Sequence, residues 1–327
     1  MPTRRQFASH LAAGAVSAAS ASSVFSQGVS PSSSTSTLIV PFSAGSLADL
    51  LARRYATLLA EASGNTHLID NLPGGAGVIA SRALLRRPAD GRTLLWANSG
   101  LICNTPLLAK PPLDFDPVTD FTPVCIFAAS PFVLFAGRDF PASSLDELQR
   151  FARAQAEPVS YVGADVGSAN HVAAEVLMQR LGARGMHVPY RNNQQAYLDV
   201  SEGRVQVGVF GWNNIAPLVK AGKAKILAVL ADKPLLADPG IPTMASQGHG
   251  RFDIQGWFGL FALKGTPAVQ IAEHEKQMQA MLRNKGFADF LVDAGQEPAF
   301  RGHAQAVPFV EAEVDRYRRV LQRLKLI

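Results

Sequence analysis

Four short segments of this chain hold residues suited to binding a small anion: 42–46, 98–100, 163–170 and 210–214. Each follows a short apolar run typical of a strand and precedes a helical pattern, and together they are rich in serine, asparagine and glycine. In open α/β sheets, ligands bind at the carboxyl ends of the strands, where helix N-termini offer free N–H groups to a carboxylate. The segments therefore predict a site that holds a small carboxylate without transforming it, although single residues among them could equally be helix caps and turns.

The sequence lacks the common signatures of catalytic and cofactor sites. No G-x-S-x-G motif marks a nucleophilic serine, and no H-E-x-x-H motif or cluster of carboxylates marks a metal site. The segment 75–80 fits the G-x-G-x-x-A pattern of dinucleotide-binding turns. However, Asn98 ends the next strand, where such a site needs an acidic residue, so we interpret the glycines as a turn before a helix. We expect no catalytic residues, no cofactor and no metal ion.

Apolar strands alternate with helical runs over two successive stretches of the chain. The first stretch begins at Leu38 and the second at Phe132, and each alternation predicts a sheet flanked by helices. From Ala268 onward the pattern is helical only, so we expect this tail to pack back onto the first unit. Because the chain then crosses between the units twice, this is the topology of a two-lobed binding protein that closes like a hinge. The predicted lobes are 38–131 plus 257–327, and 132–256.

The first 27 residues indicate the compartment. Arg4 and Arg5 precede Phe7, and an uncharged run rich in alanine and serine follows over 11–25. A basic start, a short apolar stretch and small residues before a cleavage point are typical of an export signal, and the paired arginines resemble a twin-arginine signal. We therefore predict an export signal over 1–27, a flexible leader over 28–37 and a periplasmic mature protein. The alternative is an N-terminal segment that happens to contain two arginines.

Charge and cysteine content narrow the partners. The formal charge of +5 includes Arg4 and Arg5, which leave with the signal, and the remaining basic residues are scattered. Without a basic stripe interleaved with aromatic residues, nucleic acid is not an expected partner. Cys103 and Cys125 could form a disulfide in an oxidising compartment or remain buried thiols, and the sequence leaves both possibilities open.

Short motifs through most of the chain, in one consistent order, resemble those of the Bug family (Bordetella uptake gene products), which are extracytoplasmic solute receptors of tripartite tricarboxylate transporters. The motifs are IVPF at 39–42 with Gly45 and Asp49, DNLPGGAG at 70–77, DGRTLL at 90–95, DFTPV at 120–124, HVPY at 187–190, KAGK at 220–223, IPT at 241–243 and WFGLF at 257–261.

This resemblance implies an α/β fold of the type II-like periplasmic binding protein kind, with a mostly parallel sheet in each lobe and a carboxylate in the cleft. It implies that segments 42–46 and 163–171 hold the carboxylate through backbone groups and water. We expect Asp49 to orient the first loop, and Arg191 and Trp212, which depart from the family pattern, to favour an acid with an aromatic or extended body. The expected ligand-binding residues are Phe42, Ser43, Ala44, Gly45, Ser46, Asp49, Asn98, Ser99, Gly163, Gly167, Ser168, Asn170, His171, Arg191, Asn192, Phe210, Trp212 and Asn213.

We therefore expect a monomeric periplasmic receptor that captures a small organic, amino or aromatic acid and presents it to the membrane subunits of a tripartite transporter. Two alternatives remain open from the sequence: an exported enzyme such as a hydrolase, and a receptor that reports its ligand to a sensor. The sequence does not name the acid.

Overall fold

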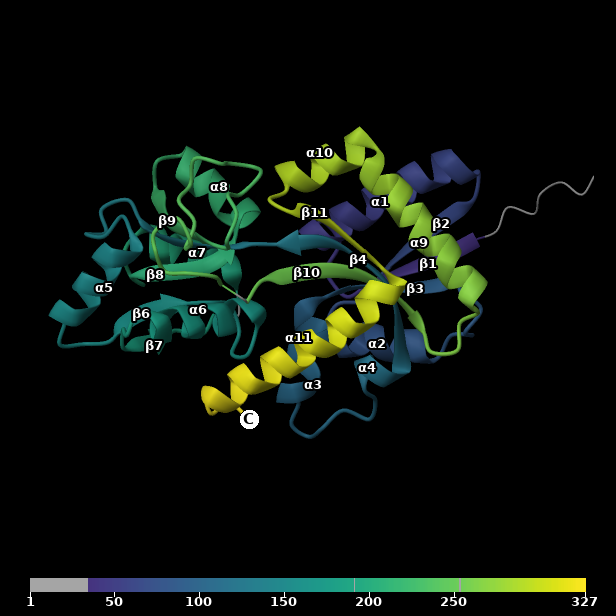
Figure 1. The fold of residues 1–327 in the computed structure, drawn as a ribbon, viewed down its shortest axis with the longest axis horizontal. Helices are drawn as coiled ribbons and strands as arrows, with labels where there is room; N and C mark the ends of the chain where they lie inside the picture. The colour runs from purple at the N-terminus through teal and green to yellow at the C-terminus, as the bar shows by residue number, and fades with distance from the viewer. Residues whose placement is uncertain (1–34, 191, 253) are drawn as a thin grey trace, which may run out of the picture. The chain divides into compact units, whose positions relative to one another are not determined.

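A computed structural model describes residues 35–190, 192–252 and 254–327 (Figure 1). The predicted export signal, the leader as far as residue 34 and Arg191 lie outside this part of the chain. The described part begins with strand β1 (Thr35–Val40), so the leader predicted over 28–37 is too long by three residues. Residues 35–37 pair in parallel with the first half of β2 (Thr66–Asn71). The sequence did not reveal this part of the strand, because threonine is β-branched and suits a strand as well as a linker.

The first sheet has six strands in the order β11-β4-β10-β3-β1-β2. β1 pairs in parallel with β2 and β3, whereas β10 is antiparallel to β3 and β4, and β11 is antiparallel to β4. The bounds of its remaining strands are β3 Thr93–Asn98, β4 Phe121–Ser130, β10 Gly256–Leu263 and β11 Glu297–Gly302.

The second sheet has five strands in the order β7-β6-β8-β5-β9. β6 is parallel to β7 and β8, and β5 is antiparallel to β8 and β9. The bounds of its strands are β5 Phe132–Gly137, β6 Val159–Val162, β7 Gly185–His187, β8 Val207–Gly211 and β9 Ala224–Leu230.

Both sheets are mixed, which corrects the expectation of mostly parallel sheets. The chain enters the second sheet through Pro131 alone, between β4 and β5, and returns through residues 231–255 into β10. β10 then inserts between β3 and β4 and runs antiparallel to both. It is antiparallel to β4 because β4 leads into the second sheet, whereas β10 comes back from it. The two-sheet α/β fold is as expected, and the lobe boundaries 38–131 plus 257–327 and 132–256 remain our proposal.

The tail after Ala268 is not purely helical. It contains α9 (Ala268–Arg283), α10 (Lys285–Asp293), strand β11 and α11 (His303–Arg323). β11 reads EPAFRG, which has neither an apolar run nor a clean alternation, and it pairs only with β4 at the edge of the sheet. An edge strand with one partner needs little of the apolar patterning from which strands are recognised in a sequence.

Successive residues of β3 face two separate cores. Trp96 packs with Tyr55 of α1 (Leu47–Ser63) and Phe127 on one face of the first sheet, where α9 and α10 also lie. Leu95 packs on the opposite face with α2 (Val78–Leu85) and α11. This alternation follows from the two-residue period of a strand, and it explains why the apolar run of β3 is continuous.

Helices cover both faces of the second sheet as well (Figure 1). α5 and α6 pack on one face, and α7 and α8 pack on the other around Phe135 and Phe210. α11 also contacts α6, so one helix touches elements of both sheets. The bounds of these helices are α5 Leu145–Ala154, α6 Ala169–Arg180, α7 Asn193–Ser201 and α8 Trp212–Lys220.

Cys103 and Cys125 are free and buried, which answers the question that the sequence left open. Burial raises the pKa of both thiols, so neither is a reactive thiolate at neutral pH. Within the described residues, the helices are too short or too polar to serve as membrane spans.

Candidate functional site

A cavity of about 610 Å³ lies where loops that follow strands of both sheets meet. Its wall takes Pro41 and Phe42 from the end of β1, a glycine-rich turn after β2, and Asn98 from the end of β3. The loop between β6 and α6 supplies the opposite side, from Asp165 to Asn170. These are the carboxyl ends of the parallel strands, the edge at which open α/β sheets bind ligands.

The start of α6 presents uncommitted backbone donors to this cavity. Ser168 caps the helix, since its Oγ accepts from the N–H of His171 at 3.2 Å and donates to the carbonyl of Gly163 at 2.6 Å. The N–H groups of Ala169 and Asn170 form no hydrogen bond within the described residues, and both residues line the cavity. Free N–H groups at the positive end of a helix dipole are suited to a carboxylate.

Side chains around this helix start hold it in place. Asn170 Nδ2 donates to the carbonyl of Val209 in β8 at 3.1 Å, and the N–H of Gly167 donates to His171 Nδ1 at 2.8 Å. The N–H groups of the loop are therefore positioned before any ligand arrives, which reduces the entropy lost on binding.

Asn104 joins the two sides of the cavity. It lies in a single wide helical turn, η2 (Gly100–Asn104), and its Nδ2 donates to the carbonyl of Gly167 at 2.8 Å. The residue is 2% exposed, and its Oδ1 has no hydrogen-bond partner among the described residues. An unpaired buried amide oxygen lowers the stability of the folded protein. A hydrogen-bond donor on a water or on a bound ligand would remove this cost.

Gly167 is in close contact with the opposite wall. Its φ is +80°, and a Cβ placed on it would lie 2.1 Å from Cδ1 of Leu108, in the short helix α3 (Thr105–Leu108). Only glycine allows this approach in this conformation. Together with the Asn104 hydrogen bond, the contact shows that the loops of the two sheets are closed on each other.

The turn Gly75–Gly77 (η1) and the start of α2 form another part of the wall. Gly77 has a φ of +93°, and a Cβ there would lie 2.5 Å from Cδ1 of Leu101. From its sequence, we interpreted this G-x-G-x-x-A segment as a structural turn and did not expect it in the site. The signal was nevertheless present, because a glycine turn before a helix is the feature that placed the other loops at the site.

Two histidines, a tyrosine and a glutamate form a cluster that contacts the loop before α6. The rings of His171 and His187 lie 4.0 Å apart, and Tyr161 stacks on His171 while its hydroxyl donates to Glu175. His187 Nε2 lies 3.2 Å from the carbonyl of Ala164 in the loop. Burial, reinforced by the nearby His171, lowers the pKa of His187 to about 4.

Asp49 organises the first loop, as expected, and does not line the cavity. Its carboxylate accepts from the N–H of Gly45 at 2.8 Å, from Arg53 Nε at 2.9 Å and from Asn71 Nδ2 at 2.9 Å. Burial raises the pKa of Asp49, but the hydrogen bonds from Arg53, Gly45 and Asn71 outweigh it, so the pKa lies below its usual value. The carboxylate of Asp49 thereby ties the N–H of Gly45 in the first loop to the side chains of Arg53 and Asn71.

The wall is largely apolar and carries two ionisable side chains within the described residues. Leu101, Leu108 and Val166 are among its apolar members. Lys110 is the cation and Asp165 the anion, and neither forms a hydrogen bond or ion pair through its side chain within the described part of the chain. The cavity therefore combines neutral donors at one helix start with an apolar surface, a lysine and an aspartate.

The structure places five of the predicted site residues in the cavity wall: Phe42, Asn98, Gly167, Ser168 and Asn170. Twelve others lie outside it, and Arg191 is not among the described residues. Phe210 and Trp212 are buried in the core of the second sheet, and Asn192 caps α7. Ligand contacts by these twelve stay a prediction: Ser43, Ala44, Gly45, Ser46, Asp49, Ser99, Gly163, His171, Asn192, Phe210, Trp212 and Asn213.

Sequence reasoning missed several residues of the wall. Asn104, Leu108 and Lys110 lie in a connection that has no strand-to-helix pattern, so no rule pointed to it. Asp165 and Val166 fall inside a predicted loop, but were not singled out.

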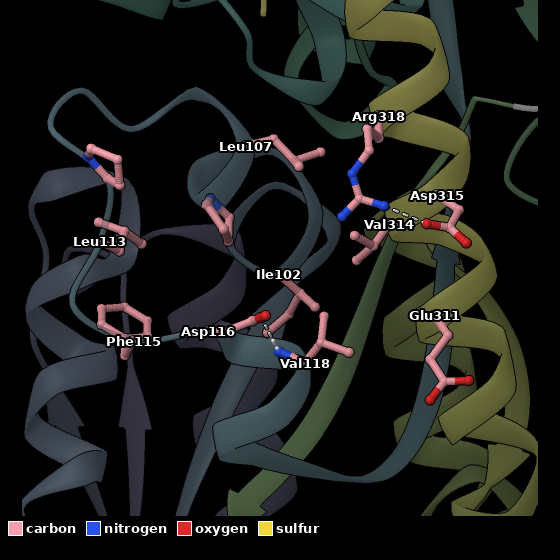
Figure 2. Close-up of a pocket in the computed structure, with 12 residues that line it drawn as sticks. Ile102, Leu107, Leu113, Phe115, Asp116, Val118, Glu311, Val314, Asp315 and Arg318 are labelled. Atoms are coloured by element: carbon pink, nitrogen blue, oxygen red, sulfur yellow. Dashed lines mark hydrogen bonds and ion pairs between the residues drawn. The ribbon is translucent and has the colours of Figure 1, made fainter.

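A second pocket of about 520 Å³ lies beside α11 (Figure 2). Ile102, Phe115 and Val314 form part of its wall, Arg318 pairs with Asp315 at 2.5 Å, and Asp116 accepts from the N–H of Val118 at 2.9 Å. All its lining residues come from around the first sheet, and none of the predicted site residues is among them. The first cavity is therefore the better candidate.

Comparisons with known proteins agree with this architecture. The family described as the tripartite tricarboxylate transporter family receptor (TctC) matches residues 51–326. The BugT protein of Bordetella pertussis is 27% identical over 285 residues, which cover 87% of this chain and 87% of BugT. Among solved structures, Rpa4515 of R. palustris, solved with adipate, is 30% identical, covers 88% of this chain and 96% of its own, and superposes with a TM-score of 0.78. MatC of Rhodopseudomonas palustris, solved with bound malate, is 26% identical, with coverage of 88% and 98% and a TM-score of 0.74.

The match to the TctC family extends over most of the chain, and the resemblance to the Bug proteins that the motifs indicated is confirmed. This family consists of solute receptors, and its solved relatives include proteins with bound dicarboxylates. The chain belongs to the TctC family of tripartite tricarboxylate transporter receptors.

Proposed function

We propose that this protein binds a small carboxylate in the 610 Å³ cavity and delivers it, in the periplasm, to the membrane subunits of a tripartite transporter. The observation that carries the proposal is the pair of uncommitted N–H groups, those of Ala169 and Asn170, at the start of a helix that faces the cavity. Each of these two N–H groups donates a hydrogen bond to a carboxylate oxygen of the ligand, and the helix dipole stabilises the negative charge of the carboxylate.

The remaining wall favours a ligand with an aliphatic body and a second charge. Beyond the helix start the wall is mostly apolar, and Lys110 can meet an anionic group that lies away from the first. A dicarboxylate with several methylene groups fits these features, and each buried methylene contributes about 0.8 kcal/mol. Rpa4515, a relative with the same fold, was solved with the six-carbon dicarboxylate adipate.

Closure of the two loops is the signal that the membrane subunits receive. Asn104 and Gly167 come from opposite sides of the cavity, and their hydrogen bond joins the two loops in the closed arrangement. A ligand that contacts both sides shifts the equilibrium towards this closed arrangement by its difference in affinity for the closed and open forms.

Thermal unfolding tests the proposal against a panel of dicarboxylates, monocarboxylates and amino acids of matched length. A bound ligand at a hundred times its Kd stabilises the folded state by about 2.7 kcal/mol, which raises the unfolding temperature by several degrees. We expect a clear rise with aliphatic dicarboxylates. The absence of any rise, in protein freed of co-purified ligand by dialysis, would contradict the proposal.

The fate of the ligand separates a receptor from an exported hydrolase. After prolonged incubation with the protein, the acid recovered from the sample should be chemically unchanged in its proton NMR spectrum. A new product that forms in proportion to protein concentration would instead favour an enzyme.

A further inference from the structure

A third pocket, of about 330 Å³, lies between α6 and α11 and is lined mainly by arginines. Seven described residues line it, four arginines and three apolar residues, and none of these seven carries a carboxylate. We propose that this pocket is a second anion-binding site, which takes a compact and multiply charged oxyanion such as a phosphate or a polycarboxylate. Its lining residues are Val176, Arg180, Ile254, Arg316, Arg319, Val320 and Arg323.

Helical spacing brings three of the arginines to one face of α11. Arg316, Arg319 and Arg323 are separated by three and four residues, so they lie in one row along the helix. Arg180 faces them as the last residue of α6, with Val176 one turn before it. The second sheet's helix α6 thus adds one guanidinium to the three on α11.

Not all of this positive charge is neutralised within the described residues. Arg316 pairs with Glu313 at 2.8 Å, and Arg180 donates to the carbonyl of Arg251 and lies over the ring of Phe252. Arg319 and Arg323 are exposed and form no hydrogen bond or ion pair with another described residue. Like charges held in one pocket repel each other, and a shared anion removes this repulsion.

The chemistry of the pocket selects the class of ligand. Guanidinium groups bind phosphate and carboxylate oxygens through paired N–H donors, and several such groups favour an anion with more than one charge. The volume suits a small free anion, and Arg180 of α6 and Arg319 of α11 both line the pocket. Because α6 belongs to one sheet and α11 packs on the other, an anion held here ties the two together.

Isothermal titration with inorganic pyrophosphate at low ionic strength tests this site. Arg319→Gln/Arg323→Gln should weaken pyrophosphate binding at least about tenfold, whereas Arg150→Gln/Arg153→Gln, which removes two exposed arginines of α5, should change it less than about twofold. Pyrophosphate should also raise the unfolding temperature of the unsubstituted protein and of the α5 variant, but not of the α11 variant.

Three results would overturn the proposal. One is an absence of pyrophosphate binding to the unsubstituted protein, and another is equal loss of affinity in both double variants. The third is that the protein binds phosphatidylglycerol vesicles but not free pyrophosphate, and that the α11 variant no longer binds the vesicles. The arginines would then recognise a membrane surface and not a free anion. Because the probe is not a carboxylate, the test does not depend on which acid occupies the 610 Å³ cavity.

Discussion

Lys110 is the cation of the described cavity wall, and its exposure limits what it contributes. Substitution with glutamine should weaken adipate binding by about three- to tenfold, because one charge-assisted contact to the distal carboxylate is lost. Hexanoate, which has the same chain length and one carboxylate, should bind Lys110→Gln as it binds the unsubstituted protein. Calorimetric titration measures both affinities.

Lys264→Gln is the matched control for this substitution, since Lys264 is exposed and lines none of the three pockets. An equal loss of affinity for adipate and hexanoate in Lys110→Gln would show that the lysine does not contact the second carboxylate of adipate.

Asn104 should affect all ligands alike. Asn104→Leu removes the hydrogen bond to Gly167 and leaves that carbonyl unpaired, which destabilises the closed arrangement by about 1–3 kcal/mol. The affinities for adipate and hexanoate should therefore fall by the same factor, of about tenfold or more. A loss confined to one of the two acids, or none, would contradict the role of Asn104 in closure.

At the residue scale, the sequence located the start of α6 but not the whole wall. Ser168 and Asn170 follow a strand and open a helix, and that pattern alone identified them. Lys110 and Asn104 reach the cavity because the chain after β3 folds back over it, and this path depends on tertiary packing that local patterns do not encode. Phe210 also lies at the end of a strand, but its side chain is buried in the core of the second sheet, and its contact with a ligand stays a prediction.

At the scale of elements, the loop before α6 rests on the cluster around His187. The pKa of His187, about 4, lies below the usual value for histidine. At a pH between these two pKa values, the unfolded chain therefore binds more protons than the folded protein. Stability should therefore fall as the pH drops from about 7 to 4, and His187→Gln should make this fall shallower. Chemical denaturation at a series of pH values measures the slope.

The groups that face His187 are the ring of His171, the ring of Tyr161, the carboxylate of Glu175 and the carbonyl of Ala164. His249→Gln is the control, since His249 pairs with Asp146 on α5, away from this cluster. If His187→Gln and His249→Gln changed the pH dependence equally, the cluster would not be its source.

The start of α5 carries a strong local signal, because S-x-x-E is a spacing typical of a helix N-terminus. Ser144 caps the helix, and its Oγ accepts from the N–H of Glu147 at 3.2 Å. The carboxylate of Glu147 accepts from the N–H of Ser143 rather than from that of the cap residue. β11 was missed because its pairing with β4, and not its own sequence, makes it a strand.

At the scale of the whole molecule, closure depends on the absence of a side chain at Gly167. Gly167→Ala adds a Cβ that meets Leu108 and places alanine at a positive φ, which costs about 1–2 kcal/mol. Ligand affinity should fall by about tenfold, whereas the unfolding temperature without ligand should change little if the open form relieves the strain. Calorimetry and thermal unfolding of the same samples separate the two effects.

Leu108→Ala in the Gly167→Ala background provides the internal check. It removes the Cδ1 atom that the new Cβ meets, so part of the lost affinity should return, and the remainder reports the strain at the positive φ. An affinity that stays normal in Gly167→Ala would show that the loops need not close in this way.

The two-sheet architecture could be predicted because strands and helices alternate twice along the chain, and the pairing within the sheets could not. The central position of β10 illustrates the limit: its apolar run identifies a buried strand, but its insertion between β3 and β4 is decided by contacts across more than a hundred residues. Apolar strands buried on both faces look the same in parallel and antiparallel sheets.

A crystal structure of the protein with the most stabilising dicarboxylate of the panel tests the central claim most directly. We predict one carboxylate within about 3 Å of the backbone nitrogens of Ala169 and Asn170, and the second directed towards Lys110. An acid bound instead in the pocket beside α11 (Figure 2), or in the cavity with its carboxylates away from the start of α6, would contradict the account.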